Sequence, residues 1–221
     1  MKLCGKIAAV MLKSLLHVIC KVDDKELEKI PLKGPFIIAM NHISFLEVPL
    51  FYVDLAPRKV HGIAKKETWK NLITRILANC WDSISIDREG FTASTFRKVR
   101  NFLNQDRIIV IAPEGTRTGD GKLIKAHPGI ISMAMLSDVP IIPVVHFGAE
   151  SFWKNIARFK RTPFTYRVGK PLRINTSEKN SRIRQELVDQ LMLRLAELLP
   201  PQYRGYYSDL NEIDTKYYEV L

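Results

Sequence analysis

An imidazole and a carboxylate lie five residues apart directly after an apolar run. His42 and Glu47 follow residues 36–40, Phe-Ile-Ile-Ala-Met, which are typical of a buried strand. On one regular helix, side chains five positions apart point roughly 140° away from each other. A loop at His42 that leads into a helix near Ser44 removes this obstacle. Glu47 would then accept a hydrogen bond from one ring nitrogen of His42 and leave the other nitrogen as a base.

The same segment also has a structural interpretation. Ser44 and Glu47 have the spacing of a capping box, in which a hydroxyl and a carboxylate accept hydrogen bonds from the first N–H groups of a helix. A histidine near a helix start is usually structural or merely polar. On this segment alone, both interpretations stay open.

A second apolar run ends in a polar turn. Residues 108–112 precede Pro113, Glu114, Gly115, Thr116 and Arg117. Proline removes a backbone donor and glycine tolerates unusual backbone angles, so the chain must turn here. The turn places a carboxylate, a hydroxyl and a guanidinium at a strand end, where open α/β sheets commonly bind ligands. The alternative is an ordinary polar turn.

A third strand-like run, residues 84–86, leads into Asp87 and Arg88. A guanidinium in this position can bind a phosphate through two parallel hydrogen bonds. A single arginine at a strand end is more often a surface ion-pair partner.

In this order and spacing, the three segments resemble the glycerolipid acyltransferase family, which includes the lysophosphatidic acid (1-acylglycerol-3-phosphate) acyltransferases. Residues 41–47 match the family motif N-H-x4-D, with Glu47 in place of Asp, and residues 113–117 match P-E-G-T-R. Residues 82–88 follow G-x-I-F-I-D-R, with Asp82 for Gly and Ser85 for Phe. Residues 139–144 match V-P-I-x-P-V, and residues 64–67 resemble the family's A-K-K-E segment.

Two departures from the family pattern bear on the site. Glu47 is one methylene longer than Asp, so its carboxylate needs another rotamer or a shifted backbone to hold the imidazole. The family often has Lys-x-Gly after the third motif, whereas residues 125–129 read Lys-Ala-His-Pro-Gly. Either Lys125 or His127 would therefore serve the ligand.

The resemblance implies acyl transfer from a thioester to a hydroxyl. His42 would be the general base, a role that typically contributes a factor of ~10²–10⁴. Glu47 would fix the tautomer of His42 and stabilise the imidazolium. No covalent enzyme intermediate, metal or organic cofactor is implied, and the acyl-CoA or acyl-carrier-protein thioester is a co-substrate.

The leading acceptor is lysophosphatidic acid, acylated at its sn-2 hydroxyl to give phosphatidic acid. Alternatives are glycerol-3-phosphate, another lysophospholipid, an acylated amino acid lipid, or a catalytically silent lipid-binding protein. The resemblance implies substrate contacts from Arg88, Glu114, Gly115, Thr116, Arg117 and Lys125, and structural or pocket roles for Asn41, Asp87, Pro113 and Pro143.

Alternation of strand-like and helix-length segments predicts an α/β fold with a mostly parallel central sheet flanked by helices. The expected strands cover residues 35–40, 59–64, 83–87, 107–112, 141–147 and 164–168. Leucine spacing predicts an amphipathic helix from 181 to 199, ended by two prolines. We expect a membrane-docking segment at 1–33, the α/β domain at 34–199, and an aromatic tail at 200–221 that docks on the domain or at the lipid boundary.

The net charge of +11 favours polyanionic partners. On a helical projection of the N-terminus, Lys2, Lys6, Lys13 and His17 share one face, while Ile7, Met11, Leu15, Ile19 and Val22 share the other. Such a helix can lie in the interface of an anionic membrane, or pack on the protein's own core. A full membrane span would bury a lysine. We expect monotopic attachment to the cytoplasmic face of the cell membrane.

A second basic stretch, residues 151–173, contains no acidic residue and is interleaved with aromatic side chains. We find no zinc-finger spacing or RNA-recognition signature, so nucleic acid is not the expected partner. Membrane lipid, a coenzyme A phosphate or an acidic acyl carrier protein fits better, and an ordinary basic surface is the alternative. Three cysteines without metal-ligand spacing agree with a reducing cytoplasm.

Overall fold

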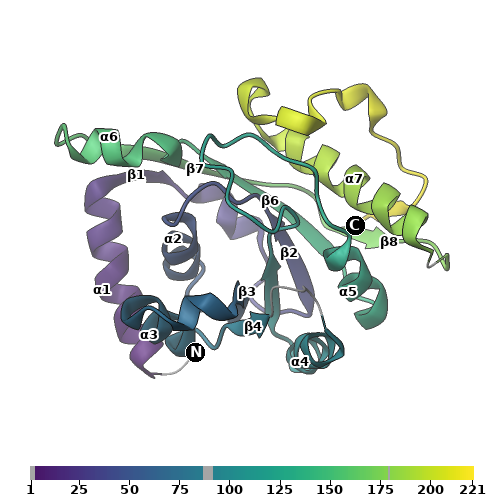
Figure 1. Ribbon diagram of the computed structural model, residues 1–221, viewed down its shortest axis with the longest axis horizontal. Coiled ribbons are helices and arrows are strands. Elements are labelled where there is room, and N and C mark those ends of the chain that lie inside the picture. The colour runs from purple at the N-terminus through teal and green to yellow at the C-terminus, as the bar shows by residue number, and fades with distance from the viewer. Residues whose placement is uncertain (1–2, 87–91, 179) are drawn as a thin grey trace.

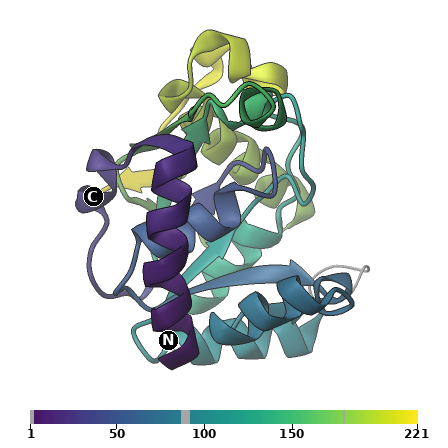
Figure 2. The same cartoon turned by 90° about the vertical axis from the view of Figure 1, so that its left-hand side faces the viewer.

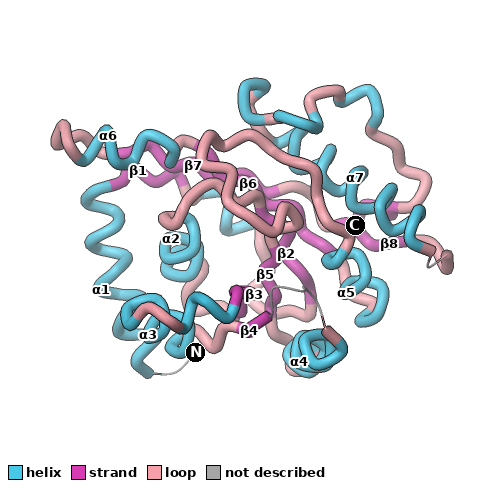
Figure 3. The backbone as a smooth tube through the Cα atoms, viewed as in Figure 1, coloured by secondary structure: helices cyan, strands magenta, loops and turns pink. Residues whose placement is uncertain are grey.

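The computed structural model describes residues 3–86, 92–178 and 180–221, with side chains described from residue 9 onward. Its strands form one sheet at the centre of the molecule (Figures 1 and 3). They are β1 (Cys20–Asp23), β2 (Phe36–Met40), β3 (Val60–Lys65), β4 (Ile84–Ile86), β5 (Ile108–Ile111), β6 (Ile141–Phe147), β7 (Thr162–Val168), β8 (Leu172–Ile174) and β9 (Tyr218–Val220).

The strand order is β1-β7-β6-β2-β5-β3-β4, with β8 paired to β6 and β9. From β6 to β4, neighbouring strands run parallel. Strand β7 runs antiparallel to β6 and carries β1 parallel to itself. The predicted mostly parallel sheet is therefore confirmed, with an antiparallel addition beside β6.

Helices cover both faces of this sheet. They are α1 (Leu3–Ile19), α2 (Glu47–Asp54), α3 (Leu72–Cys80), α4 (Ala93–Leu103), α5 (Gly129–Ser137), α6 (Phe152–Ile156) and α7 (Ser181–Leu198). Figure 1 shows α1 and α2 on one side of the sheet and α4, α5 and α7 on the other. Each side has its own buried apolar cluster. Central strands covered on both faces explain why β2 and β5 read as continuous apolar runs.

The C-terminal tail docks on the α/β domain, as predicted. The side chains of Tyr207, Tyr217 and Tyr218 are buried. The Tyr218 hydroxyl donates a hydrogen bond to the Leu187 carbonyl of α7 at 2.8 Å. Strand β9 pairs with β8 at the edge of the sheet.

Two predicted helix boundaries are wrong. The N-terminal helix was expected to reach Val22, but it ends at Ile19 because β1 pairs with Thr162–Thr165 of β7. The helix expected near Ser44 begins at Glu47. The N–H groups of Ile43 and Ser44 instead donate to the Glu47 carboxylate, so the residues before Glu47 form a hydrogen-bonded loop.

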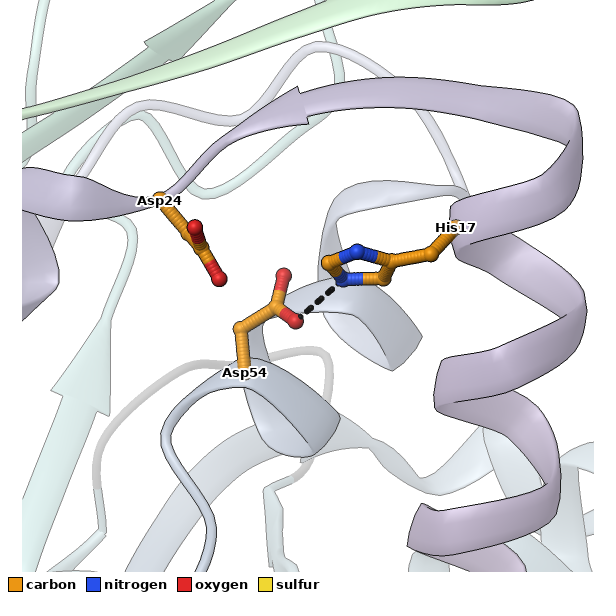
Figure 4. Close-up of side chains that lie close together, drawn as sticks. All are labelled: His17, Asp24 and Asp54. Carbon is orange, nitrogen blue, oxygen red and sulfur yellow. Dashed lines mark hydrogen bonds and ion pairs between the residues drawn. The ribbon is translucent and has the colours of Figure 1, made fainter.

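The orientation of α1 also differs from the expectation. Lys13 and His17 point inward, because a buried carboxylate at the end of α2 requires a counter-charge. The His17 Nε2 atom lies 2.7 Å from Asp54 Oδ1, and Lys13 Nζ lies 3.3 Å from the same oxygen. In Figure 4 the carboxylate of Asp24 also points toward this pair.

The outward surface of α1 is consequently apolar. Val10, Met11, Leu15 and Val18 are 58–71% exposed, and Met11 and Leu15 belong to the predicted apolar face. Among the described residues, no helix combines the length and apolar character needed to cross a bilayer. Figure 2 shows α1 on the side of the molecule that faces the viewer.

Two arginines of the basic stretch have structural contacts. Arg161 donates to the carbonyls of His17 and Cys20, both at 2.7 Å. Arg167 forms an ion pair with Asp23 at 3.1 Å. These contacts join the N-terminal segment to β7 and the residue before it, so these two side chains have a structural role that neither alternative described.

We predict that His17→Leu lowers the free energy of unfolding by about 2 kcal/mol, because it removes one of the partners of a buried charge. The double variant His17→Leu/Asp54→Asn should recover part of this loss, since the uncompensated charge is then gone. Urea denaturation at neutral pH measures both. Equal stabilities of the single and double variants would contradict the ion-pair account.

Candidate active site

The two residues with which the sequence analysis began are in contact. The loop after β2 carries His42, and its Nδ1–H donates a hydrogen bond to Glu47 Oε1 at the start of α2. The Glu47 side chain is completely buried, whereas about a quarter of the His42 side chain (24%) is exposed. This arrangement leaves Nε2 of His42 as the unprotonated nitrogen that can accept a proton. The predicted contact is present, and its catalytic role is treated below as a proposal.

Glu47 also holds the loop that precedes its own helix. Its second oxygen, Oε2, accepts hydrogen bonds from the N–H groups of Ile43 at 3.0 Å and Ser44 at 2.7 Å. The Ser44 hydroxyl accepts one from Leu46 N–H at 3.2 Å. One carboxylate oxygen therefore holds the loop while the other orients the imidazole, and α2 itself, with Leu46 at its N-cap, has no side-chain cap.

Glu114 fixes the backbone of the His42 loop. Its buried carboxylate accepts hydrogen bonds from His42 N–H at 2.8 Å and from Ile124 N–H at 3.1 Å. Burial raises the pKa of Glu114 to about 7, although both N–H donors lower it. The resemblance implied a substrate contact for Glu114, and the structure turns this carboxylate toward the protein backbone.

Further hydrogen bonds join the first and third motifs. The N–H groups of Thr118 and Gly119 donate to the carbonyls of His42 and Ile43, both at 3.0 Å. Gly115 has a φ of +67°, a left-handed conformation that favours glycine. A Cβ at Gly115 would lie 3.3 Å from the His127 ring, so His127 packs against the turn.

The other residues of the third motif surround this contact. Gly115, Thr116 and Arg117 are exposed on the turn, and Pro113 beneath them is buried. Lys125 and His127, the two alternative ligand residues, are both exposed. His127 packs against the turn at Gly115.

The remaining predicted residues lie elsewhere. Asn41 is buried and binds the backbone of β6. Pro143 is buried in β6 opposite Ala39, where it supports the sheet. Asp87 and Arg88 lie outside the described residues.

Burial, together with two nearby cations, keeps the imidazole of His42 neutral. Burial chiefly, followed by the charges of Arg117 and Lys65, lowers the pKa of His42 to about 4. At neutral pH the ring is therefore neutral, with a proton on Nδ1 and none on Nε2, as a general base must be. Because Arg117 follows β5 and Lys65 ends β3, the fold brings two positive side chains to the same imidazole.

The sequence analysis assigned no site role to two residues that contact or influence this site. Lys65 was noted only as part of the A-K-K-E segment. Its place at the end of an expected strand could have indicated that it lies near the other strand-end residues of the site. His146 is completely buried in β6 and bonded to Asn41. Its signal was a single histidine in the apolar run that follows the fourth motif.

Within the described part of the chain, one group of side chains is close enough to hold a metal ion. One ligand atom each of His17, Asp24 and Asp54 lies within 4.8 Å of the others. The Lys13 ammonium already lies 3.3 Å from Asp54 and 3.9 Å from Asp24. We interpret this group as an ion-pair cluster that anchors α1, about 10 Å along α2 from Glu47.

We predict that Lys65→Met raises the pKa of His42 by about half a unit, because losing a nearby cation makes the imidazolium less unfavourable. NMR titration of the His42 ring measures the shift. Lys98→Met is the matched control, since Lys98 is an exposed lysine of α4 on the other side of the sheet. An unchanged or lowered pKa in Lys65→Met would contradict the electrostatic account.

The chain is similar to known acyltransferases in sequence and in fold. A family model described as Acyltransferase matches residues 21–146. A Bacillus subtilis (strain 168) protein named 1-acyl-sn-glycerol-3-phosphate acyltransferase is 28% identical over 167 residues, 76% of this chain and 81% of its own. A Limnanthes alba protein of the same name is 33% identical over 147 residues, 64% of this chain and 51% of its own.

Two further matches extend this result. The Homo sapiens protein named 1-acyl-sn-glycerol-3-phosphate acyltransferase alpha is 30% identical over 175 residues, 76% of this chain and 60% of its own. The chain thus spans only about half to three fifths of the plant and human proteins. The crystal structure of the LPA acyltransferase PlsC from Thermotoga maritima shares the fold, with a TM-score of 0.62 and 19% identity over 88% of this chain and 78% of its own.

Proposed function

The chain belongs to the acyltransferase family, as its motifs predict, and we propose that it moves a fatty acyl group from a thioester to the sn-2 hydroxyl of lysophosphatidic acid. The product would be phosphatidic acid. The observation that carries this proposal is the contact between His42 and the buried Glu47, with the charges of Arg117 and Lys65 acting on the same imidazole. The acceptor is inferred from the names of the relatives.

In the proposed mechanism, Nε2 of His42 accepts the proton of the acceptor hydroxyl while its oxygen attacks the thioester carbonyl. Glu47 holds Nδ1–H and stabilises the imidazolium that forms. Collapse of the tetrahedral intermediate breaks the carbon–sulfur bond. The imidazolium then gives its proton to the departing thiolate, so the products are an ester and a thiol and the protein returns to its initial state.

Lys65 and Arg117 supply the positive charge that an acceptor phosphate requires. Arg117 follows β5, Lys65 ends β3, and the charges of both lower the pKa of His42. A phosphate bound between them would partly neutralise these charges. Arg88, which lies outside the described residues, is proposed as a third phosphate ligand on the strength of its motif.

The acyl donor is proposed to be a coenzyme A or acyl-carrier-protein thioester, both of which are anionic. Lys154, Arg158 and Lys160 are exposed around α6 and provide a basic surface for either donor or for lipid headgroups. No metal or organic cofactor enters the proposed steps.

We propose that the protein docks peripherally on the cytoplasmic face of the membrane. The support is an apolar surface built from three helices: Val10, Met11, Leu15 and Val18 of α1, Leu72, Ile73 and Ile76 of α3, and Trp153 of α6 are all exposed. Figures 1 and 2 place α1, α3 and α6 on the same side of the molecule. An apolar surface bordered by lysines and arginines fits the interface of an anionic bilayer.

His42→Ala should lower kcat by a factor of roughly 10²–10⁴, because a general base is lost. Glu47→Asp should keep most of the activity, whereas Glu47→Gln should lose it because the neutral amide cannot stabilise the imidazolium. The assay offers a labelled acyl thioester of each donor type to the purified protein in lipid micelles, with lysophosphatidic acid as acceptor.

Glycerol-3-phosphate and lysophosphatidylcholine are offered in parallel to test the alternative acceptors. Transfer to one of these in place of lysophosphatidic acid would overturn the proposed acceptor but keep the mechanism. Wild-type transfer that survives in His42→Ala would contradict the mechanism itself. No transfer to any acceptor would favour the silent lipid-binding alternative.

Leu15→Glu/Val18→Glu should weaken binding to vesicles rich in phosphatidylglycerol. Removing two apolar side chains from the interface costs about 3 kcal/mol, or roughly 100-fold in affinity. Leu136→Glu is the matched control, since Leu136 is an exposed leucine of α5 on the other side of the molecule. Vesicle flotation measures both variants, and wild-type binding by the double variant would refute this docking surface.

A further inference from the structure

A second imidazole lies on the far side of the Glu47 carboxylate. His146 of β6 is completely buried, and its Nε2 atom lies 3.0 Å from the Asn41 carbonyl and 3.4 Å from Glu47 Oε2. Its ring stacks on Phe164, with centroids 5.2 Å apart and planes 7° from parallel. Glu47 thus lies between His42, which contacts Oε1, and His146, which approaches Oε2.

The neighbours of His146 determine its tautomer. Both groups near Nε2 are oxygen acceptors, so Nε2 must carry the proton and donate it. Burial lowers the pKa of His146 to about 3, which keeps the ring neutral and singly protonated. The ring therefore presents one fixed N–H donor to the space between Asn41 and Glu47.

The backbone of His146 reinforces this position. Its N–H donates to Asn41 Oδ1 and its carbonyl accepts from Asn41 Nδ2, both at 2.9 Å. These bonds and the one from Nε2 join β6 to the residue directly before His42. The imidazole consequently has little freedom to move away from Glu47.

Simple core packing does not explain an imidazole here. Within the described part of the chain, Nδ1 of His146 has no hydrogen-bond partner. A buried polar atom without a partner is unfavourable, and an apolar ring of similar size would stack on Phe164 without this cost. The feature that an apolar ring could not supply is the Nε2–H donor.

We infer that His146 is a positioning residue for the His42–Glu47 pair: its Nε2–H donates to the Asn41 carbonyl and its positive end lies 3.4 Å from Glu47 Oε2, so that Oε1 stays directed at His42. This inference rests on the proposed general-base role of His42. His146 does not touch the substrate and takes no part in proton transfer.

His146→Phe and His146→Gln separate positioning from packing. Phenylalanine keeps the stacking on Phe164 but removes the donor, whereas glutamine keeps an N–H donor at similar reach. In the acyl-transfer assay, His146→Phe should lower kcat roughly 10–100-fold with KM values unchanged, because a small misplacement of catalytic groups is costly. His146→Gln should restore most of the wild-type kcat.

A double-mutant cycle tests whether His146 acts through Glu47. In the Glu47→Gln background, His146→Phe should cause little further loss, because the oriented carboxylate is already absent. An equal loss in both backgrounds would overturn the inference, as would wild-type kcat in His146→Phe. Thermal melting of each variant identifies any loss that comes from unfolding.

The NMR signal of the His42 Nδ1 proton reports the hydrogen bond between His42 and Glu47 directly. This measurement needs no acceptor lipid. We expect this strongly deshielded signal to move or broaden in His146→Phe and to persist in His146→Gln. An unchanged signal in His146→Phe would overturn the inference. If wild-type protein acylates no acceptor, the proposed function fails, while this spectrum still decides whether His146 positions Glu47.

Discussion

A carboxylate without solvent exposure lies at the first residue of α2, and the surrounding chain is arranged to supply its hydrogen-bond donors. The Glu47 side chain is completely buried, and an isolated charge in such a place would be strongly unfavourable. The N–H groups of Ile43 and Ser44, together with the Nδ1–H of His42, provide the compensation. These hydrogen bonds therefore favour the conformation of the loop after β2 that brings His42 to Glu47. Stability and function depend on the same contacts.

Helix α2 carries a buried carboxylate at each end, and the two carboxylates have different roles. Its first residue, Glu47, orients the proposed base, and its last residue, Asp54, binds Lys13 and His17 of α1. Both carboxylates are buried, and both are compensated by side chains from other segments. Lys13 and His17 lie toward Asp54, and Val10, Met11, Leu15 and Val18 of α1 are exposed. The surface proposed to meet the membrane thus follows from the requirement to neutralise Asp54.

The central strands and the contact between His42 and Glu47 were predictable from sequence, because apolar runs and motif spacing are local properties. The direction in which α1 faces was not predictable. A helical projection identifies residues that share a face, but it does not reveal that a buried Asp54 lies opposite Lys13. The position of His146 beside Glu47 was not predictable either, because it depends on the pairing of β6 with β2. Strand β1 has only four residues, and its pairing with β7 depends on contacts far along the chain.

The account depends on which nitrogen of His42 carries the proton. A ¹⁵N spectrum of the histidine-labelled protein at neutral pH, with His42→Gln used to assign the signal, measures this directly. We predict a neutral ring protonated at Nδ1, with Nε2 unprotonated and available as the base. A ring protonated at Nε2, or a doubly protonated imidazolium, would contradict the account.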